Sequence, residues 1–323
     1  MKFSIVIPVY NRPEEVKELL ESLAIQTYKN FEVVIVEDGS SIKCESIVEV
    51  YKNLLSIAYY FKINEGRSIA RNYGIEKATG DYFIIFDSDC IIPENYLSIV
   101  NEFLLNNPVD CYGGPDRAHS SFTPIQKAIS YSMTSFLTTG GLRGSSKKIT
   151  KFYPRSFNMG FNKKVMQATG GFPNIPLAED IDLSFRIEKA GLKIALIENA
   201  FVYHKRRTSF KQFYRQVNRF GIGRIDLYKK YPETLKLTHF IPALFIGFTL
   251  VSIIVSAIHY LFILPLFIYL LLLFIDASFK NKSLYIGSLS VWSTLVQLFG
   301  YGSGFIKAFI KRVLFKQAEF AKY

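Results

Sequence analysis

The chain has 323 residues, 49% of them hydrophobic, and its mean hydropathy of +0.17 is high for a purely soluble protein. Its net charge of +12 arises after residue 199, because residues 1–199 carry 22 Lys and Arg against 23 Asp and Glu. The basic residues adjoin apolar segments, which favours a membrane surface as partner and argues against nucleic acid. The three cysteines are widely spaced and indicate neither a disulfide framework nor a metal cluster, which favours a reducing compartment.

The first part of the chain alternates between strand-like and helix-like segments. Apolar runs predict strands at residues 3–7, 31–36, 57–61 and 82–86, and helices are expected from Pro13 onward, at 47–54 and at 68–77. This alternation predicts a parallel α/β sheet, in which ligands bind beyond the carboxyl ends of the strands. Polar residues follow three of these ends: Asn11 follows the strand at 3–7, Asp38 the strand at 31–36, and both Asp87 and Asp89 the strand at 82–86.

A long apolar region follows the α/β part. Residues 239–275 contain no Asp, Glu, Lys or Arg, which is too long for one membrane helix and sufficient for two. Residues 283–306 are also uncharged but rich in Gly and Ser, so they predict a third span or an interfacial or re-entrant helix. Basic residues at 280, 282 and in the tail prefer the cytoplasmic side, which favours two spans and an interfacial segment.

The start of the chain is too short and too β-like for a signal peptide, so we expect the N-terminal domain to stay in the cytoplasm. The expected organisation is a domain over 1–220, a basic juxtamembrane segment over 221–238, a transmembrane hairpin over 239–279, and a membrane or interfacial segment with a basic tail over 283–323. Residues 138–151, rich in Gly and Ser, are expected to form a mobile loop.

Asp87-Ser88-Asp89 is the first motif that indicates chemistry. Two carboxylates one residue apart at a strand end can hold Mg²⁺ or Mn²⁺, which prefer oxygen ligands and often bind through substrate phosphates. Taken alone, the triplet is a weak signal that favours a solvated turn, because Asp-x-Asp occurs by chance in many loops. Its position directly after the apolar run at 82–86 favours the metal site.

Several short motifs occur together in a fixed order. Residues 4–11, 36–41, 70–72, 79–82 and 87–89, followed by 170–172 and 179–183, resemble the family 2 glycosyltransferases over about residues 1–220. The resemblance implies the GT-A fold, a Rossmann-like α/β nucleotide-sugar-binding domain, here followed by a helical membrane region.

The resemblance also implies roles for residues on the donor side. Pro8 and Tyr10 would line the nucleotide pocket, Asp38 would accept a hydrogen bond from the base, and Asp89 would be the principal metal ligand. Asp87 would lie near the donor ribose or sugar and beside the metal. Further donor-binding residues would be Asn11, Gly66 and Arg71. His204 either completes the metal site or is a structural histidine.

On the acceptor side, the resemblance implies that Asp180 is the general base that deprotonates the acceptor hydroxyl, with inversion at the anomeric carbon. Capping of the following helix is the alternative role for Asp180 and Asp182. Glu179 and Asp182 would accompany the base. Gln216 and Arg219 resemble part of a Gln-x-x-Arg-Trp motif of processive synthases, with Phe220 replacing Trp. The basic residues around Arg219 either flank the membrane or hold a phosphate.

These observations predict an inverting, metal-dependent glycosyltransferase that uses a nucleotide-sugar donor and acts on a lipid-linked or cell-surface glycan at the inner membrane, with its catalytic domain in the cytoplasm. A processive polysaccharide synthase and a non-catalytic membrane scaffold with a nucleotide-sugar fold are the alternatives. The sequence leaves open which sugar, nucleotide and acceptor are used.

Overall fold

The computed structural model describes residues 1–140 and 152–317, and the chain forms two compact units. The sheet unit comprises Met1–His119, Gly141–Ile175 and Glu179–Lys205. The helical unit comprises Ser120–Gly140, Pro176–Ala178 and Arg206–Tyr323. Most of the loop expected at 138–151 and the end of the expected tail, 318–323, lie outside the described residues.

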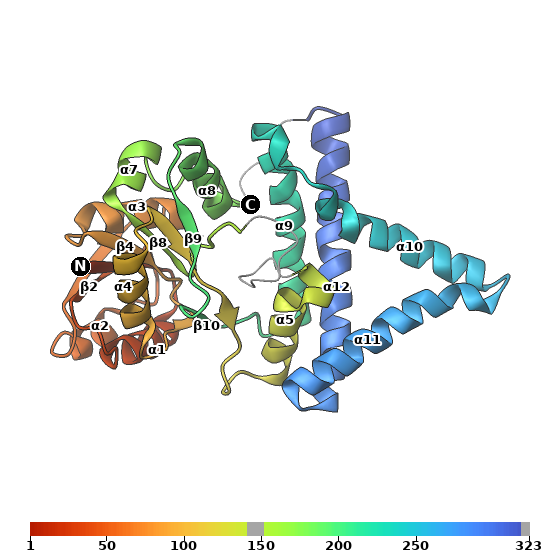
Figure 1. The fold of residues 1–323 in the computed structure, drawn as a ribbon, viewed down its shortest axis with the longest axis horizontal. Coiled ribbons are helices and arrows are strands. Elements are labelled where there is room, and N and C mark those ends of the chain that lie inside the picture. Colours follow the sequence, from red (N-terminus) through yellow and green to blue (C-terminus); the bar gives the residue numbers. More distant parts are fainter. Residues whose placement is uncertain (141–151, 318–323) are drawn as a thin grey trace. The chain divides into compact units, whose positions relative to one another are not determined.

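A seven-stranded sheet with the order β3-β2-β1-β4-β8-β6-β9 forms the centre of the sheet unit (Figure 1). The pairs β1–β2, β2–β3, β1–β4 and β6–β9 are parallel, whereas β8 is antiparallel to β4 and β6. The strands are β1 (Phe3–Val9), β2 (Phe31–Asp38), β3 (Ile57–Lys62), β4 (Tyr82–Ile85), β6 (Cys111–Gly113), β8 (Met159–Asn162) and β9 (Ile194–Leu196).

Two hydrophobic cores cover the two faces of this sheet. Side chains alternate between the faces along β1, so Ile5 and Ile7 belong to one core and Val6 to the other, and all three are fully buried. The first core includes residues of α1 (Pro13–Ala24), α2 (Glu45–Tyr51) and α4 (Tyr96–Asn106). The second includes residues of α3 (Arg67–Lys77), α7 (Lys163–Thr169) and α8 (Glu179–Lys189).

A smaller sheet with the order β5-β10-β7 joins distant parts of the sheet unit. Its strands are β5 (Cys90–Ile91), β7 (Asp116–Arg117) and β10 (Val202–His204). The antiparallel pairing of β10 with β5 sets His204 opposite Cys90. This pairing brings the segment around His204 to the end of the Asp87-Ser88-Asp89 motif.

The helical unit consists of helices that pack on a long central helix. Its α-helices are α5 (Pro124–Thr134), α6 (Phe136–Thr139), α9 (Phe210–Lys230), α10 (Ile241–Ser256), α11 (Leu264–Asn281) and α12 (Leu284–Ala308). Helix α12 contacts α5, α9, α10 and α11. Helices α10 and α11 leave α12 and converge at the turn around residues 257–263 (Figure 1).

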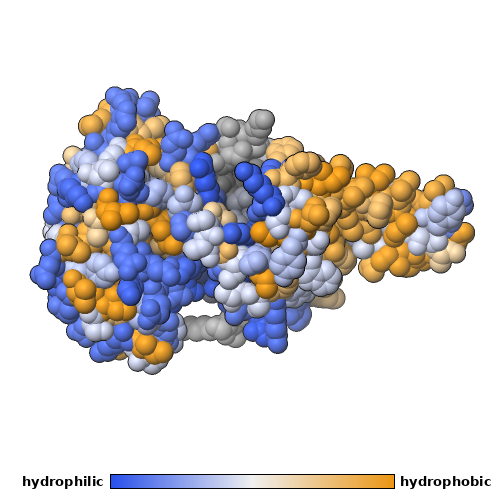
Figure 2. Space-filling view, turned by 90° about the horizontal axis from the view of Figure 1, so that it is seen from below, coloured by the Kyte–Doolittle hydropathy of each residue, from blue (hydrophilic) through white to orange (hydrophobic). Residues whose placement is uncertain are grey.

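Two helical segments of this unit, Leu237–Ser256 and Tyr260–Asn281, are long and apolar enough to cross a membrane. The most apolar stretch of each is only 11% and 17% buried, whereas the core helix of a soluble domain is mostly buried. Figure 2 shows the hydrophobic residues gathered over this hairpin. The hairpin expected at 239–279 is therefore present as two exposed apolar helices.

The predicted α/β architecture followed by a helical region is confirmed, and the strands at the four predicted positions are present as β1, β2, β3 and β4. The compact units divide differently from the expected segments. Residue 220 lies inside α9, which belongs wholly to the helical unit, and Ser120–Gly140 leaves the sheet unit to join α9 and α12. The reason is hydrophobic packing, since Ile129 and Met133 share a core with Phe213 and Val217.

Candidate active site

The carboxyl ends of β1, β2 and β4 carry the residues predicted for the donor side. Because β1 pairs in parallel with both β2 and β4, these ends lie at the same edge of the sheet. Asn11 follows β1 in a left-handed conformation, with φ of 53°. Its side-chain oxygen accepts hydrogen bonds from the backbone N–H groups of Ser41 (2.8 Å) and Ile42 (3.0 Å). Asn11 therefore fixes the loop that follows β2.

Asp38 is buried and its carboxylate is engaged within the protein. It accepts hydrogen bonds from the backbone N–H groups of Glu65 (3.0 Å) and Gly66 (2.9 Å) and from Lys62 Nζ (3.0 Å). Gly66 has φ of 98°, a conformation that favours glycine, and directly precedes α3. Asp38 and Gly66, both predicted donor residues, thus hold each other at the start of α3. Of the predicted pocket residues before them, Tyr10 is 54% exposed and Pro8 is half-buried.

A buried arginine connects the two halves of the predicted site. Arg71 on α3 is 1% exposed, and its guanidinium bonds to Asp87 (2.8 Å) and to Glu179 (2.9 Å). Arg67, one helical turn earlier, also reaches Glu179. The Arg71 guanidinium lies 5.1 Å from the ring centre of Phe172. Arg71 is therefore a structural bridge between the donor and acceptor motifs, whatever contact it makes with a donor.

Asp89 is the centre of a second cluster. Its Oδ2 bonds to Arg12, and its Oδ1 lies 3.2 Å from Nε2 of His204. Burial raises the pKa of Asp89, but His204 and Arg12 outweigh burial and hold it well below its usual range. A backbone hydrogen bond from Lys205 to the Asp89 carbonyl (2.9 Å) fixes the β5–β10 pairing here. Stacking on Phe157, with ring centres 4.6 Å apart, fixes the plane of the His204 ring.

The donor set of this cluster fits a divalent metal ion. Among the described residues, ligand atoms of Asp89, Cys90 and His204 lie within 4.8 Å of one another. Oδ1 of Asp89 is buried and, apart from facing His204, makes no other hydrogen bond among the described residues. Two neighbouring ligands of an octahedral ion, each at about 2.1 Å, lie about 3.0 Å apart, close to the 3.2 Å separation here. Asp87 is not a member of this group of described residues, and its carboxylate bonds to Arg71.

Asp180 lies at the start of α8 and is 16% exposed. Its carboxylate accepts hydrogen bonds from the backbone N–H groups of Ile181 (2.8 Å) and Ser156 (3.4 Å), and Arg155 approaches it at 3.9 Å. Ala178, two residues before Asp180, has φ of 60°, a strained conformation for a residue with a side chain. A fixed, partly exposed carboxylate next to backbone strain is a common feature of functional sites.

The remaining predicted acceptor residues have different surroundings. Asp182 is fully buried and bonds to Arg186 (3.1 Å), which donates a hydrogen bond to the carbonyl oxygen of Gly171 (2.8 Å). This ion pair ties α8 to the Gly170-Gly171 turn, which gives Asp182 a structural task. Gln216 and Arg219 lie on α9 in the helical unit.

Sequence reasoning missed the arginines that approach the two predicted carboxylates, Arg12 at Asp89 and Arg155 at Asp180. Arg12 follows Asn11 just after β1, at the edge of the sheet where the carboxylate of Asp89 was expected. A cation at the same edge could therefore have been predicted to pair with that carboxylate. Arg155 carries no comparable signal, since it approaches Asp180 through a loop.

Comparisons with known proteins add a family and a fold. The sequence model of Glycosyl transferase family 2 matches residues 4–170. An uncharacterised glycosyltransferase of Rickettsia felis is 41% identical over 106 residues, which is 33% of this chain and 18% of the relative. The glycosyltransferase GlyA of Streptococcus pneumoniae is 33% identical over 110 residues, or 34% of this chain and 16% of the relative. The matched segment thus spans under a fifth of these two relatives.

Two solved structures share the fold. The mannosyltransferase PcManGT of Pyrobaculum calidifontis, in complex with GDP-Man and Mn²⁺, aligns with a TM-score of 0.64 at 17% identity, covering 98% of this chain and 88% of that one. TarS of S. aureus aligns with a TM-score of 0.51 at 24% identity, covering 69% of this chain and 39% of that one. At these identities the likeness establishes the fold.

Proposed function

This chain is a member of glycosyl transferase family 2, and from that premise we propose that it transfers a sugar from a nucleotide-sugar donor to an acceptor hydroxyl. The observation that carries the proposal is the arrangement around Asp89. A buried carboxylate oxygen faces His204 at 3.2 Å, at the sheet edge where ligands of parallel α/β sheets bind.

The residues of the sheet unit suit a direct displacement. In this step Asp180 accepts the proton of the acceptor hydroxyl while the hydroxyl oxygen bonds to the anomeric carbon. The bond from that carbon to the donor diphosphate breaks, its electrons leave with the diphosphate, and the configuration at the carbon inverts. The backbone N–H groups of Ile181 and Ser156 hold the Asp180 carboxylate for this task.

Asp89 and His204 are the residues that would hold a divalent metal, Mn²⁺ or Mg²⁺. The bound ion would supply positive charge that neutralises the diphosphate leaving group. Mn²⁺ and GDP-Man are bound by PcManGT, and UDP-GlcNAc is bound by TarS of S. aureus, whose complex aligns with a TM-score of 0.50. These complexes support a metal and a nucleotide-sugar here and leave the sugar and the base open.

The two apolar helices support action at a membrane. We place the acceptor, a lipid-linked or cell-surface glycan, at the inner membrane, with the sheet unit in the cytoplasm. The basic residues that follow residue 199 suit an anionic membrane surface.

The test is donor turnover by the full chain in detergent with Mn²⁺ or Mg²⁺, screened across UDP-, GDP- and dTDP-sugars. We expect Asp89→Ala and Asp180→Asn each to lower turnover at least 100-fold, and Asp180→Asn to keep donor binding. A wild-type protein that binds no donor and releases no nucleotide contradicts the catalytic proposal and favours the scaffold. Full turnover by Asp180→Asn contradicts only the assignment of the base.

A further inference from the structure

The two apolar helices attach to opposite parts of α12. The start of α10 touches α12 at Gly302, where a Cβ atom would lie 2.6 Å from the carbonyl oxygen of Pro242. The end of α11 touches α12 at Gly287, where a Cβ atom would lie 2.0 Å from Ser278 Oγ. The two helices of a hairpin enter and leave a bilayer at the same membrane surface. Both attachment points, Gly287 and Gly302, therefore lie at that membrane surface, and they are about 22 Å apart along α12 at 1.5 Å per residue.

Helix α9 fixes the depth of α12 independently of the hairpin. The two helices pack with their backbones in contact, since a Cβ atom at Gly304 would lie 2.1 Å from the Asn218 carbonyl oxygen and one at Gly221 would lie 2.2 Å from that of Tyr301. The Asn218 side chain donates to the Gly300 carbonyl oxygen (3.1 Å). Any movement of α12 into the hydrocarbon would therefore carry α9 with it.

Charges along α9 exclude it from the hydrocarbon. They occur on every turn of its 21 residues, as Lys211, Arg215, Arg219, Arg224, Asp226, Lys229 and Lys230. Ionised side chains are expensive inside a bilayer and are stable at the headgroup level. Helix α12, locked beside α9, is consequently held at the same level.

The face of α12 away from α9 suits contact with lipid. Tyr285 (64% exposed), Trp292 (56% exposed) and Phe299 recur at intervals of seven residues and so share one face, and Phe299 contacts Phe245 of α10. Small polar residues of α12 face protein instead, as Ser293 bonds to Ser132 of α5 (2.9 Å). Trp and Tyr are the side chains that favour the membrane interface.

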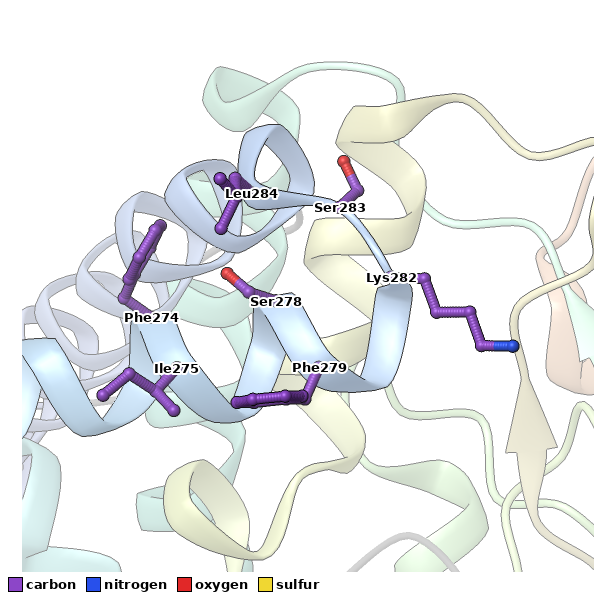
Figure 3. A pocket seen from close by; sticks show the side chains of 7 residues that line it. All are labelled: Phe274, Ile275, Ser278, Phe279, Lys282, Ser283 and Leu284. Carbon is purple, nitrogen blue, oxygen red and sulfur yellow. The ribbon is translucent and has the colours of Figure 1, made fainter.

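The turn between α11 and α12 shows the same boundary. A groove of about 340 Å³ is lined there mainly by apolar side chains, including Phe274, Phe279 and Leu284. Lys282, which also lines it, points away from the aromatic side chains (Figure 3). An apolar groove with an exposed lysine beside it suits acyl chains below an anionic headgroup.

We infer that α12 does not cross the bilayer but lies in its interface, parallel to the surface, with the face of Tyr285, Trp292 and Phe299 turned to the lipid. The partner of this face is the boundary between anionic headgroups and acyl chains. The inference rests on the membrane part of the proposed function and adds a second contact surface to the hairpin.

Trp292, the only tryptophan in the chain, provides a test without mutation. The full chain is reconstituted in phosphatidylcholine–phosphatidylglycerol vesicles that contain a quenching nitroxide at a shallow or a deep acyl-chain position. We expect the shallow quencher to reduce Trp292 fluorescence at least twofold more than the deep one. Stronger quenching by the deep label would mean that α12 spans the bilayer, and equal absence of quenching would mean that α12 does not touch it. Either result overturns the inference.

A relocated tryptophan calibrates the depth. In a Trp292→Phe background, Phe248→Trp, in the middle of α10, is expected to be quenched more by the deep label. If it is not, the hairpin is not a span, and both the inference and the membrane part of the proposed function fail. Donor turnover in detergent, measured on the same sample, is a separate readout that tests the catalytic part.

Discussion

Arg12 bonds to Oδ2 of Asp89 and leaves Oδ1 turned toward His204. A residue that fixes a metal-binding carboxylate typically contributes 10- to 100-fold to metal affinity. We therefore expect Arg12→Met to weaken Mn²⁺ binding about tenfold or more, measured by titration calorimetry or by the Mn²⁺ resonance signal. Arg117→Met removes an arginine that stacks on Phe201, 3.8 Å from the ring centre, and serves as control. Tighter Mn²⁺ binding by Arg12→Met would show that Arg12 competes with the metal.

Arg71 and Arg67 bond to the same carboxylate of Glu179 from different environments, as Arg71 is 1% and Arg67 is 53% exposed. Removing a buried partner leaves uncompensated charge, so Arg71→Met is expected to destabilise the protein by about 3–5 kcal/mol. Arg67→Met removes an exposed partner and should cost less than about 1 kcal/mol. Chemical denaturation of both variants measures the difference, and equal losses would argue against the bridging role of Arg71.

Glu32 gives the sheet unit a defined sensitivity to acid. Burial raises its pKa, but hydrogen bonds from Ser4, Thr79 and Lys2 outweigh burial and lower the pKa from 4.5 to about 2. A carboxylate with a depressed pKa stabilises the fold above pH 4.5 and loses that contribution as the pH falls toward 2.

We expect this contribution to be about 1–2 kcal/mol after allowance for solvent screening. Glu32→Gln should therefore be less stable than the wild type at pH 7, and the gap should close by pH 2. Denaturant unfolding at several pH values measures it. A gap that stays constant across this range would contradict the assigned role of Glu32.

At the scale of elements, the α9–α12 crossing depends on glycines that admit no side chain. A Cβ atom at Gly304 would lie 2.1 Å from a backbone oxygen of α9, whereas one at Gly247 of α10 would have nothing within 4 Å. Gly304→Ala must push the helices apart, with an expected cost of about 1–3 kcal/mol, while Gly247→Ala should be neutral or slightly stabilising. Thermal unfolding in detergent compares the two, and equal melting temperatures would mean that the helices accommodate the methyl group.

The elements also show how far the sequence could predict the site. The strands β1, β2 and β4 and the polar residues after them follow from local apolar runs, so Asn11, Asp38 and Asp87 could be placed at one edge. The pairing of β5 with β10 could not, because these strands have two and three residues and lie more than 100 residues apart. This pairing brings His204 to Asp89, and no periodic pattern in the sequence predicts it.

The division of the chain into two compact units could not be predicted from the sequence either. Helix α5 leaves the sheet unit because Ile129 and Met133 pack against α9, a contact between segments about 80 residues apart that no local pattern reports. The two apolar helices, in contrast, were predictable because membrane length and the absence of charge are properties of the local sequence.

At the scale of the whole molecule, membrane attachment should depend on the hairpin more than on the basic charge. Surface charge is screened by salt, whereas the transfer of two apolar helices into the bilayer is not.

We expect the wild-type chain to remain with membranes through high-salt and carbonate washes. A lysine near the middle of each helix, Leu250→Lys with Leu271→Lys, costs about 2.5–3.5 kcal/mol per residue in the bilayer and should release the protein. Ile258→Lys, at the turn between the helices, places the same charge where a spanning hairpin emerges into water, and it should leave the protein attached. If the double variant resists carbonate as well as Ile258→Lys does, the hairpin is not what holds the protein in the bilayer. The attachment must then come from another apolar surface, because high salt and carbonate remove a purely electrostatic contact.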